Sequence, residues 1–276
     1  MPLSFSKVNN NIIELQETYK KAQPFPYIIL DDFLDATDAE EVLREFPKIA
    51  EAGWIHYLHI NEKKHGLNKL DAIPDAIKTI IGKFNSDEFV NFLEELTGIK
   101  NLIADKTIEG GGIHQSERGG FLNIHADFTV HPHKSSWRRR VNVLLYLNTA
   151  WDKSYKGDLE FWDKNMTHCV TKIAPVFNRV VIFNTDETSY HGFPDPIQCP
   201  EHVTRKSIAL YYFTEEDEGS FKKKATNYKA RPEDGLKAIL IWADKKAISA
   251  YTAVKRITGI NDDFVSKVLH MFKKKL

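Results

Sequence analysis

The sequence has little cysteine, no excess of charge of either sign and no long apolar run. Its two cysteines, Cys169 and Cys199, form no CxxC pair and no disulfide framework, so we expect a reducing compartment. Lys+Arg and Asp+Glu number 38 each, so no global field attracts nucleic acid. No stretch approaches the roughly 18 consecutive apolar residues that span a membrane, and no secretory signal pattern opens the chain. We therefore expect a cytoplasmic protein without a nucleic-acid or membrane partner.

The chain is long enough for one domain with a large core, and its patterns divide that domain into three stretches. Of the 276 residues, 42% are hydrophobic and 28% are charged, which is ordinary for a globular protein. We treat residues 1–276 as a single domain. Residues 1–100 are predicted to form a mostly helical N-terminal layer with one early strand, 101–214 the core, and 215–276 a helical C-terminal extension.

Apolar residues recur at helical spacing in both outer stretches, where Asp38 is expected to cap a helix that Pro47 ends and Gly98 to stop another. The early strand is expected at residues 27–30. The other helices are expected at residues 71–82, 86–97, 234–246, 250–255 and 262–272.

Short β-prone runs, separated by turn residues, fill the middle stretch. No helical pattern interrupts them, which favours an all-β sandwich or barrel over a parallel sheet. The predicted fold class is therefore mainly β with flanking helices. The strands are expected at residues 102–108, 120–124, 140–147, 158–162, 168–173, 179–184 and 206–214.

One of these strands carries the pattern His125-Ala126-Asp127. Residues two apart on a strand point to the same face, so both side chains can aim at one point. A second histidine, His191, follows a later strand. Two histidines and one carboxylate suit Fe(II) with open coordination positions, whereas a structural zinc site would be closed by four ligands.

A basic residue at the start of the last core strand strengthens this interpretation. Arg205 lies two residues before Ser207 and opens the run that leads to Phe213. An arginine is the right partner for a dicarboxylate, because its planar guanidinium can bind a carboxylate through two hydrogen bonds.

The segment from about Gly111 to Thr214 resembles the prolyl-hydroxylase-like branch of the Fe(II)/2-oxoglutarate-dependent dioxygenases, with its HxD…H and RxS motifs. The resemblance implies a double-stranded β-helix (jelly-roll) core and the use of Fe(2+), 2-oxoglutarate and O2. It also implies hydroxylation of a substrate C–H bond while 2-oxoglutarate becomes succinate and CO2. The implied metal ligands are His125, Asp127 and His191, and the implied contacts to the far carboxylate of 2-oxoglutarate are Arg205, Tyr146 and Ser207.

A closer resemblance rests on residues 157–162, 173–179 and 189–196. These segments are similar to the catalytic domain of the ribosomal-protein prolyl hydroxylases and to its bacterial single-domain relatives. The chain is too short for the second, non-catalytic barrel of the ribosomal enzymes, and the interval from His191 to Arg205 is longer than is usual in the family. Both departures leave the substrate open between a prolyl or other protein residue and a small polar molecule.

Other residues are candidates for the same pocket. Gln115 and Asn123 are predicted to touch the co-substrate, Asn123 because it shares a strand face with His125. Arg139 and Phe128 are predicted to contact the substrate. For each, a surface or strand-pairing role is the competing interpretation. His131 and His133 repeat an HxH spacing, for which solvated loop histidines are the preferred reading over a second metal site.

Two other functions are consistent with the same barrel. One is a binding module that has lost catalysis, and the other is a cupin-like metal protein that does not use 2-oxoglutarate. The complete set of metal and carboxylate ligands favours the enzyme, because a non-catalytic domain has no physical need to keep them together. The C-terminal helices are expected to brace the barrel, with a homodimer or a docked partner as the alternatives.

Overall fold

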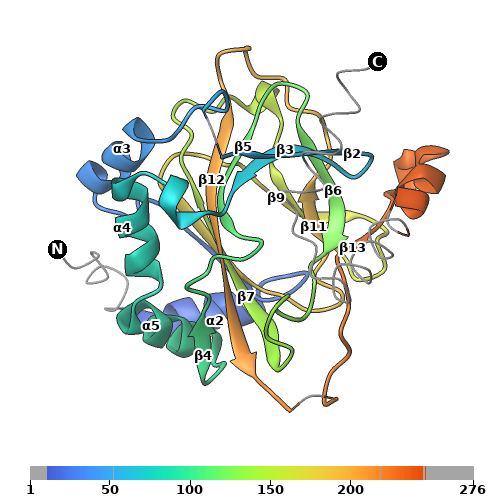
Figure 1. The fold of residues 1–276 in the computed structure, drawn as a ribbon. Helices are drawn as coiled ribbons and strands as arrows, with labels where there is room; N and C mark the ends of the chain where they lie inside the picture. Colours follow the sequence, from blue (N-terminus) through green and yellow to red (C-terminus); the bar gives the residue numbers. More distant parts are fainter. Residues whose placement is uncertain (1–10, 52, 218, 245, 247–276) are drawn as a thin grey trace.

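The computed structural model describes residues 11–51, 53–217, 219–244 and 246. Its architecture is a curled antiparallel sheet with the N-terminal helices on one side (Figure 1), so the predicted fold class, mainly β with a double-stranded β-helix core, is confirmed. The helices are α2 (Ile12–Lys21), α3 (Ala36–Arg44), α4 (Asp75–Phe84) and α5 (Asp87–Thr97). None of the described helices is long and apolar enough to cross a membrane.

The sheet contains thirteen strands, and every strand pairing in it is antiparallel. Its main path runs β1-β10-β7-β12-β5-β3-β6-β11-β8-β9, while β2, β4 and β13 lie off this path and pair with β3, β12 and β6, respectively. The strands are β1 (Tyr27–Leu30), β2 (Ile55–His59), β3 (Glu62–Leu67), β4 (Leu102–Ala104), β5 (Gly112–Ser116), β6 (Phe121–Ala126), β7 (Trp137–Tyr146), β8 (Leu159–Trp162), β9 (Cys169–Ile173), β10 (Arg179–Asn184), β11 (His191–Phe193), β12 (Arg205–Glu215) and β13 (Asn227–Tyr228).

Strand alternation separates the core from the functional pocket. On β7, Val141, Val143 and Leu145 join the apolar cluster formed with α3, α4 and α5. The alternate residues Asn142, Leu144 and Tyr146 line a cavity on the other face of the sheet. Side chains alternate between the two faces of a strand, so the helices cover one face and leave the other for chemistry.

Helix ends follow local sequence signals, with one correction. Helix α5 is capped by Ser86, whose hydroxyl accepts from the Phe89 amide at 3.3 Å, and it ends at Gly98 with φ 75°, as predicted. Helix α3, however, begins at Ala36 rather than after Asp38. Asp38 lies in the first turn and pairs with Lys83 of α4 at 2.6 Å, so it serves packing between helices instead of capping.

The main difference from the sequence-based expectation is the hairpin of β2 and β3. A single early strand was expected in residues 1–100, but β3 pairs with both β5 and β6 and is part of the barrel wall. Ile60 and Asn61 join the hairpin without the glycine that usually marks such a turn. At the other end of the chain, residues 237–244 are helical, whereas the helices expected at 250–255 and 262–272 lie outside the described residues.

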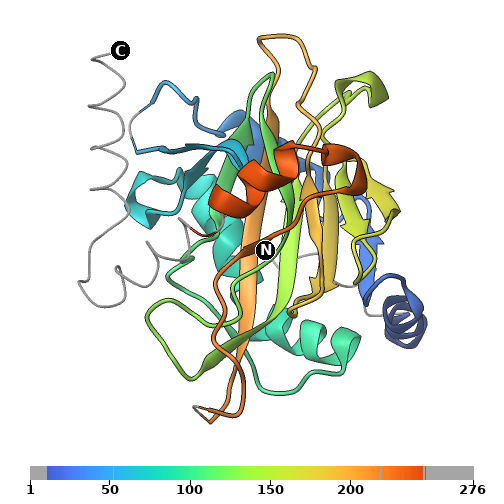
Figure 2. The same cartoon turned by 90° about the vertical axis from the view of Figure 1, so that its right-hand side faces the viewer.

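Residues 222–244 cross the open side of the sheet as a strap (Figure 2), which we call the C-terminal strap. Within it, β13 pairs with the end of β6 at Ala126 and His125. The strap therefore closes the sheet beside one of the predicted metal ligands.

Candidate active site

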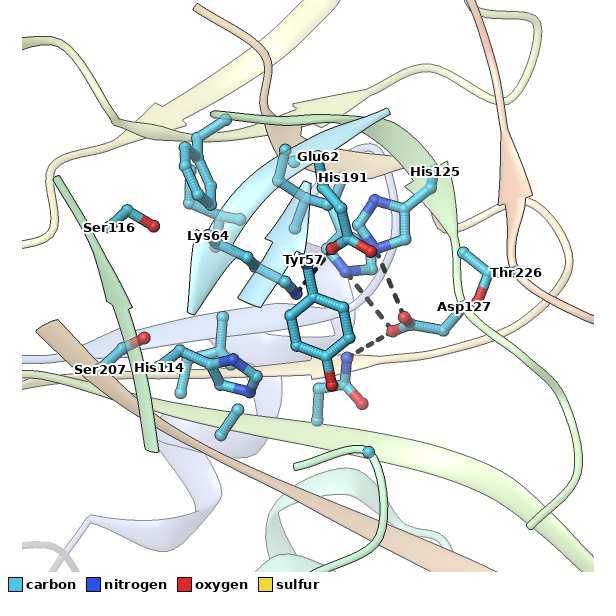
Figure 3. A pocket seen from close by; sticks show the side chains of 18 of the residues that line it. Tyr57, Glu62, Lys64, His114, Ser116, His125, Asp127, His191, Ser207 and Thr226 are labelled. Atoms are coloured by element: carbon cyan, nitrogen blue, oxygen red, sulfur yellow. Dashed lines mark hydrogen bonds and ion pairs between the residues drawn. The ribbon is translucent and has the colours of Figure 1, made fainter. Parts of the chain in front are cut away.

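The predicted metal ligands come together at the junction of β6 and β11. His125 lies directly opposite His191 in the strand register, and Asp127 follows the end of β6. Each Nε2 atom lies 3.4 Å from an oxygen of Asp127, and the three ligand atoms all lie within 4.8 Å of one another (Figure 3). In the described part of the chain, this is the one group of three or more such side chains with metal-binding spacing.

Backbone carbonyls set the orientation of both imidazoles. The Nδ1 atom of His125 lies 2.9 Å from the Asn123 carbonyl oxygen, and that of His191 lies 2.9 Å from the Ser189 carbonyl oxygen. Because a carbonyl only accepts, each Nδ1 carries the proton and each Nε2 keeps its lone pair for a metal. Burial also lowers the pKa of His191 to about 4, which favours the neutral, ligating form.

The third ligand, Asp127, is held by two buried polar side chains. Its Oδ2 accepts from the Asn142 amide at 2.8 Å and lies 2.9 Å from Nη2 of Arg139. Burial alone would raise the pKa of Asp127, but the guanidinium of Arg139 holds it well below its usual range. The carboxylate is therefore charged and oriented, as a ligand of a divalent cation must be.

Arg139 is not placed where the sequence suggested. It was expected at the substrate mouth, yet its side chain is buried, with the guanidinium carbon 3.4 Å from the ring centroid of Tyr211 and 4.5 Å from that of Phe128. It lines a small cavity behind Asp127 and not the main pocket. Phe128, the other predicted substrate contact, does line the main pocket.

At the far end of the same cavity, of about 190 Å³, lies Arg205. Its Nε donates to the Gly157 carbonyl at 2.8 Å, and Nη2 donates to the Tyr146 hydroxyl at 3.3 Å. Ser207 lines the cavity beside them, because alternation on β12 puts residues 205, 207, 209 and 211 on the inner face. The three residues predicted to hold the far carboxylate thus share one end of the pocket.

The donor set fits an Fe(II) ion with 2-oxoglutarate. Two imidazoles and a carboxylate suit Fe(II), and a buried guanidinium suits a carboxylate at the other end of the cavity. A further cavity-lining residue, His114, has a buried Nδ1 atom with no hydrogen-bond partner. Burial, with Lys64 nearby, lowers its pKa to about 3, so this imidazole is neutral and available to a ligand.

Two predicted co-substrate contacts lie outside the pocket. Gln115 alternates away from its cavity-lining neighbours on β5, and its amide donates to the Thr204 hydroxyl at 2.7 Å. Asn123 donates to the Ile60 carbonyl at 3.1 Å instead of facing the cavity with His125. The reason is a bulge, in which two residues of β6, Asn123 and Ile124, lie opposite the single residue Gly192 of β11, so the strand alternation is shifted.

Both histidines of the HxH pair were expected to be solvated, which holds for the exposed His133 but is wrong for His131, whose side chain is buried. His131 Nε2 lies 3.4 Å from an Asp105 oxygen, and the His133 amide donates to His131 Nδ1 at 3.1 Å. Neither belongs to a metal-binding group among the described residues.

Sequence reasoning missed five cavity-lining residues that come from the hairpin and the C-terminal strap. They are Tyr57, Glu62, Lys64, Thr226 and Tyr228. Residues 62–66 contain no apolar side chain, so no alternation of apolar and polar residues marked this run as a strand or placed it beside the metal ligands.

Comparisons with known proteins agree with this geometry. Residues 111–213 match the family described as the 2OG-Fe(II) oxygenase superfamily. The chain is 25% identical over 223 residues to the mouse protein named prolyl hydroxylase EGLN3, and this match covers 76% of this chain and 87% of the relative. The human protein of the same name is 24% identical over the same length.

Two solved structures share the fold. A prolyl hydroxylase from Trichoplax adhaerens, in complex with a hypoxia inducible factor peptide fragment, has a TM-score of 0.54 at 19% identity and covers 75% of this chain and 92% of its own. A Pseudomonas putida prolyl-4-hydroxylase has a TM-score of 0.53 at 16% identity, and the match covers 73% of this chain and 99% of that structure's chain. The two solved structures support the fold, while the family match and the site support a prolyl-hydroxylase-like 2OG-Fe(II) oxygenase, a dioxygenase that uses Fe(II), 2-oxoglutarate and O2.

Proposed function

We propose that this enzyme hydroxylates a prolyl residue in a polypeptide, with His125, Asp127 and His191 as the ligands of Fe(II). The observation that carries the metal and co-substrate roles is that this triad and Arg205 line one cavity. The polypeptide substrate is supported by the relatives named prolyl hydroxylase and by the neighbour bound to a peptide fragment.

In this proposal the residues of the chain bind, orient and exclude water. When bound, Fe(II) supplies O2 activation, coupled to conversion of 2-oxoglutarate to succinate and CO2 and to oxygen insertion into a C–H bond. Arg205, Tyr146 and Ser207 would hold the far carboxylate of 2-oxoglutarate. Arg139 and Asn142 would keep Asp127 oriented, and the buried cavity would limit side reactions with water.

We further propose that residues 1–276 act as a single domain. One cluster of buried apolar residues joins helices α3, α4 and α5 to strands β7, β10 and β12, so the N-terminal layer and the barrel share a core. A cytoplasmic location and a homodimer stay predictions.

The test of the metal and co-substrate roles is an anaerobic titration of the Fe(II)-loaded protein with 2-oxoglutarate. Wild type should develop the weak visible charge-transfer band of a chelated 2-oxoglutarate. His125→Ala should abolish the band, while Arg205→Ala should raise the concentration of 2-oxoglutarate that is needed. The matched controls are His168→Ala, an exposed histidine, and Lys206→Ala, the next cation on β12. Folded, iron-loaded protein without a band would refute these roles.

The substrate is then tested by mass spectrometry of proline-containing peptides incubated with enzyme, 2-oxoglutarate and O2. We expect a gain of one oxygen atom on a prolyl residue, matched by succinate release. Turnover with small polar molecules and none with peptides would contradict the polypeptide assignment while leaving the oxygenase chemistry intact.

A further inference from the structure

The β2–β3 hairpin brings a buried ion pair into the active-site cavity. Glu62 and Lys64 lie on the inner face of β3, and both line the pocket that contains the metal ligands (Figure 3). Lys64 Nζ lies 3.1 Å from Glu62 Oε2, and the two side chains are only 18% and 10% exposed. Burying two charges costs several kcal/mol per ion before their attraction is counted, so the pair is poor evidence for stability. Its position in the pocket points to a role in binding instead.

The carboxylate of Glu62 is fully engaged and fixes the position of Lys64. Its Oε1 lies 2.8 Å from His59 Nε2, and the Tyr228 hydroxyl of the C-terminal strap lies against the same carboxylate. His59 is in turn anchored at 2.9 Å by Asp244 of the strap. Burial alone would raise the pKa of Glu62, but Lys64 and His59 lower it to about 2, so the group is charged.

Lys64, by contrast, has hydrogen-bonding capacity to spare. An ammonium group carries three N–H donors, and in the described part of the chain Glu62 is the one acceptor that it contacts. Lys64 Nζ also lies 5.4 Å from the centroid of the Tyr57 ring, and Tyr211 and Asp127 are near enough to interact with it electrostatically. Two donors therefore remain for a molecule that enters the cavity.

The charges around Lys64 decide which kind of group fits there. Glu62 cancels the charge of Lys64, so the pair offers hydrogen bonds without a net positive field. A free carboxylate at this position would be repelled by Glu62, and a cation would be repelled by Lys64. The far carboxylate of 2-oxoglutarate already has Arg205. The group that fits beside Lys64 is therefore a neutral oxygen that is a good hydrogen-bond acceptor, and an amide carbonyl is such a group.

We propose that Lys64, held in place by Glu62, donates a hydrogen bond to a backbone carbonyl oxygen of a polypeptide substrate. Lys64 is then a specificity-determining residue that recognises the peptide linkage beside the hydroxylated residue. This inference rests on the proposed function, because it takes the substrate to be a polypeptide.

The test uses Fe(II)-loaded enzyme with 2-oxoglutarate under anaerobic conditions, and three probes. N-acetyl-L-proline N-methylamide has neutral amide carbonyls on both sides of the ring, N-acetyl-L-proline ends in a carboxylate, and L-proline is a zwitterion. Binding is measured as the change that each probe causes in the charge-transfer band. The variants are Lys64→Met and Lys64→Arg, with Lys63→Met as the matched control, since Lys63 is exposed on the opposite face of β3.

We expect the diamide to bind wild type and Lys63→Met equally and better than the two carboxylate probes. Lys64→Met should bind it roughly tenfold more weakly, the loss expected for a hydrogen bond from a charged donor, and Lys64→Arg should recover part of that loss. The affinity for 2-oxoglutarate should not change in Lys64→Met, which also shows that the variant is folded.

Three results would overturn the inference while the oxygenase chemistry stands. They are a normal band that no probe perturbs, a carboxylate probe that binds as tightly as the diamide, and a Lys64→Met variant that loses 2-oxoglutarate affinity instead of probe affinity. Absence of the band in wild type would be the separate failure of the proposed metal and co-substrate roles, and the inference would fall with it.

Discussion

Replacing Arg139 with methionine distinguishes two roles for this residue. Its guanidinium lies 2.9 Å from Asp127 and packs on the rings of Tyr211 and Phe128. Methionine keeps much of the packing volume but removes the charge. If Arg139 acts by orienting Asp127, the change should weaken metal binding, whereas a substrate contact would alter only the KM for substrate.

The magnitudes follow from burial. Two charges about 4 Å apart attract by about 4 kcal/mol at an effective dielectric constant of about 20. Removing one partner of a buried pair typically destabilises a protein by about 3–5 kcal/mol. At the lower figure we expect the metal-free variant to unfold roughly 6–12 °C below wild type. Loss of a partner that orients a ligand typically weakens metal binding by about 10–100-fold.

Thermal unfolding of the metal-free protein and a metal titration measure these two effects. The matched control is Arg138→Met, the neighbouring arginine, which pairs with Glu216 near the surface and should change stability by less than about 1 kcal/mol. Removing the positive charge of Arg139 would by itself strengthen the binding of a metal cation, whereas loss of the contact that orients Asp127 would weaken it. Whether the metal affinity rises or falls therefore separates the two effects. A variant that binds metal as well as wild type, or better, would refute the orienting role.

Two further predictions concern stability and backbone packing. Burial alone would raise the pKa of Asp105, but His131, the Thr107 hydroxyl and the amides of Thr107 and Glu109 lower it from 3.8 to about 2. A folded-state pKa below that of the unfolded chain stabilises the protein above pH 3.8, and this contribution is lost as the pH falls toward 2. Asp105→Asn should therefore lower the free energy of urea unfolding by about 2 kcal/mol at pH 7 and by progressively less below pH 4. An equal loss at pH 7 and pH 2 would contradict this. A Cβ at Gly192 would lie 2.7 Å from the Leu122 carbonyl oxygen, so Gly192→Ala should push β11 from β6 and weaken metal binding by at least about tenfold. Gly82→Ala in α4, where a Cβ meets nothing within 4 Å, is the control and should stabilise the protein by up to about 1 kcal/mol; equal metal affinity in the two variants would contradict the packing argument.

The parts of the site that could be predicted are those that depend on short-range pattern. Alternation along one strand was enough to place Arg205 and Ser207 together, and the HxD spacing was enough to pair His125 with Asp127. Alternation failed at Asn123, because a bulge depends on how β6 pairs with β11, and the sequence of one strand does not specify its partner's register.

Arg139 illustrates a second limit. Arg139 was expected just before the strand at residues 140–147, at the substrate mouth, and its partner was not predicted, because the sequence around a charged residue is the same whether its side chain meets solvent or a buried carboxylate. The pairing with Asp127 requires the end of β6 to lie beside β7 in space.

The sequence by itself predicted the chemistry proposed for this protein, namely the candidate metal ligands, the arginine proposed to bind a carboxylate and the alternation that puts them on inner faces. Only the tertiary structure decided what surrounds that chemistry. The β2–β3 hairpin and the C-terminal strap, distant in the chain, meet at Glu62 and supply Lys64 and Tyr228 to the pocket. The physical reason is that side-chain periodicity is a local property, whereas the partner of a strand or of a buried charge is fixed by contacts between segments far apart in sequence.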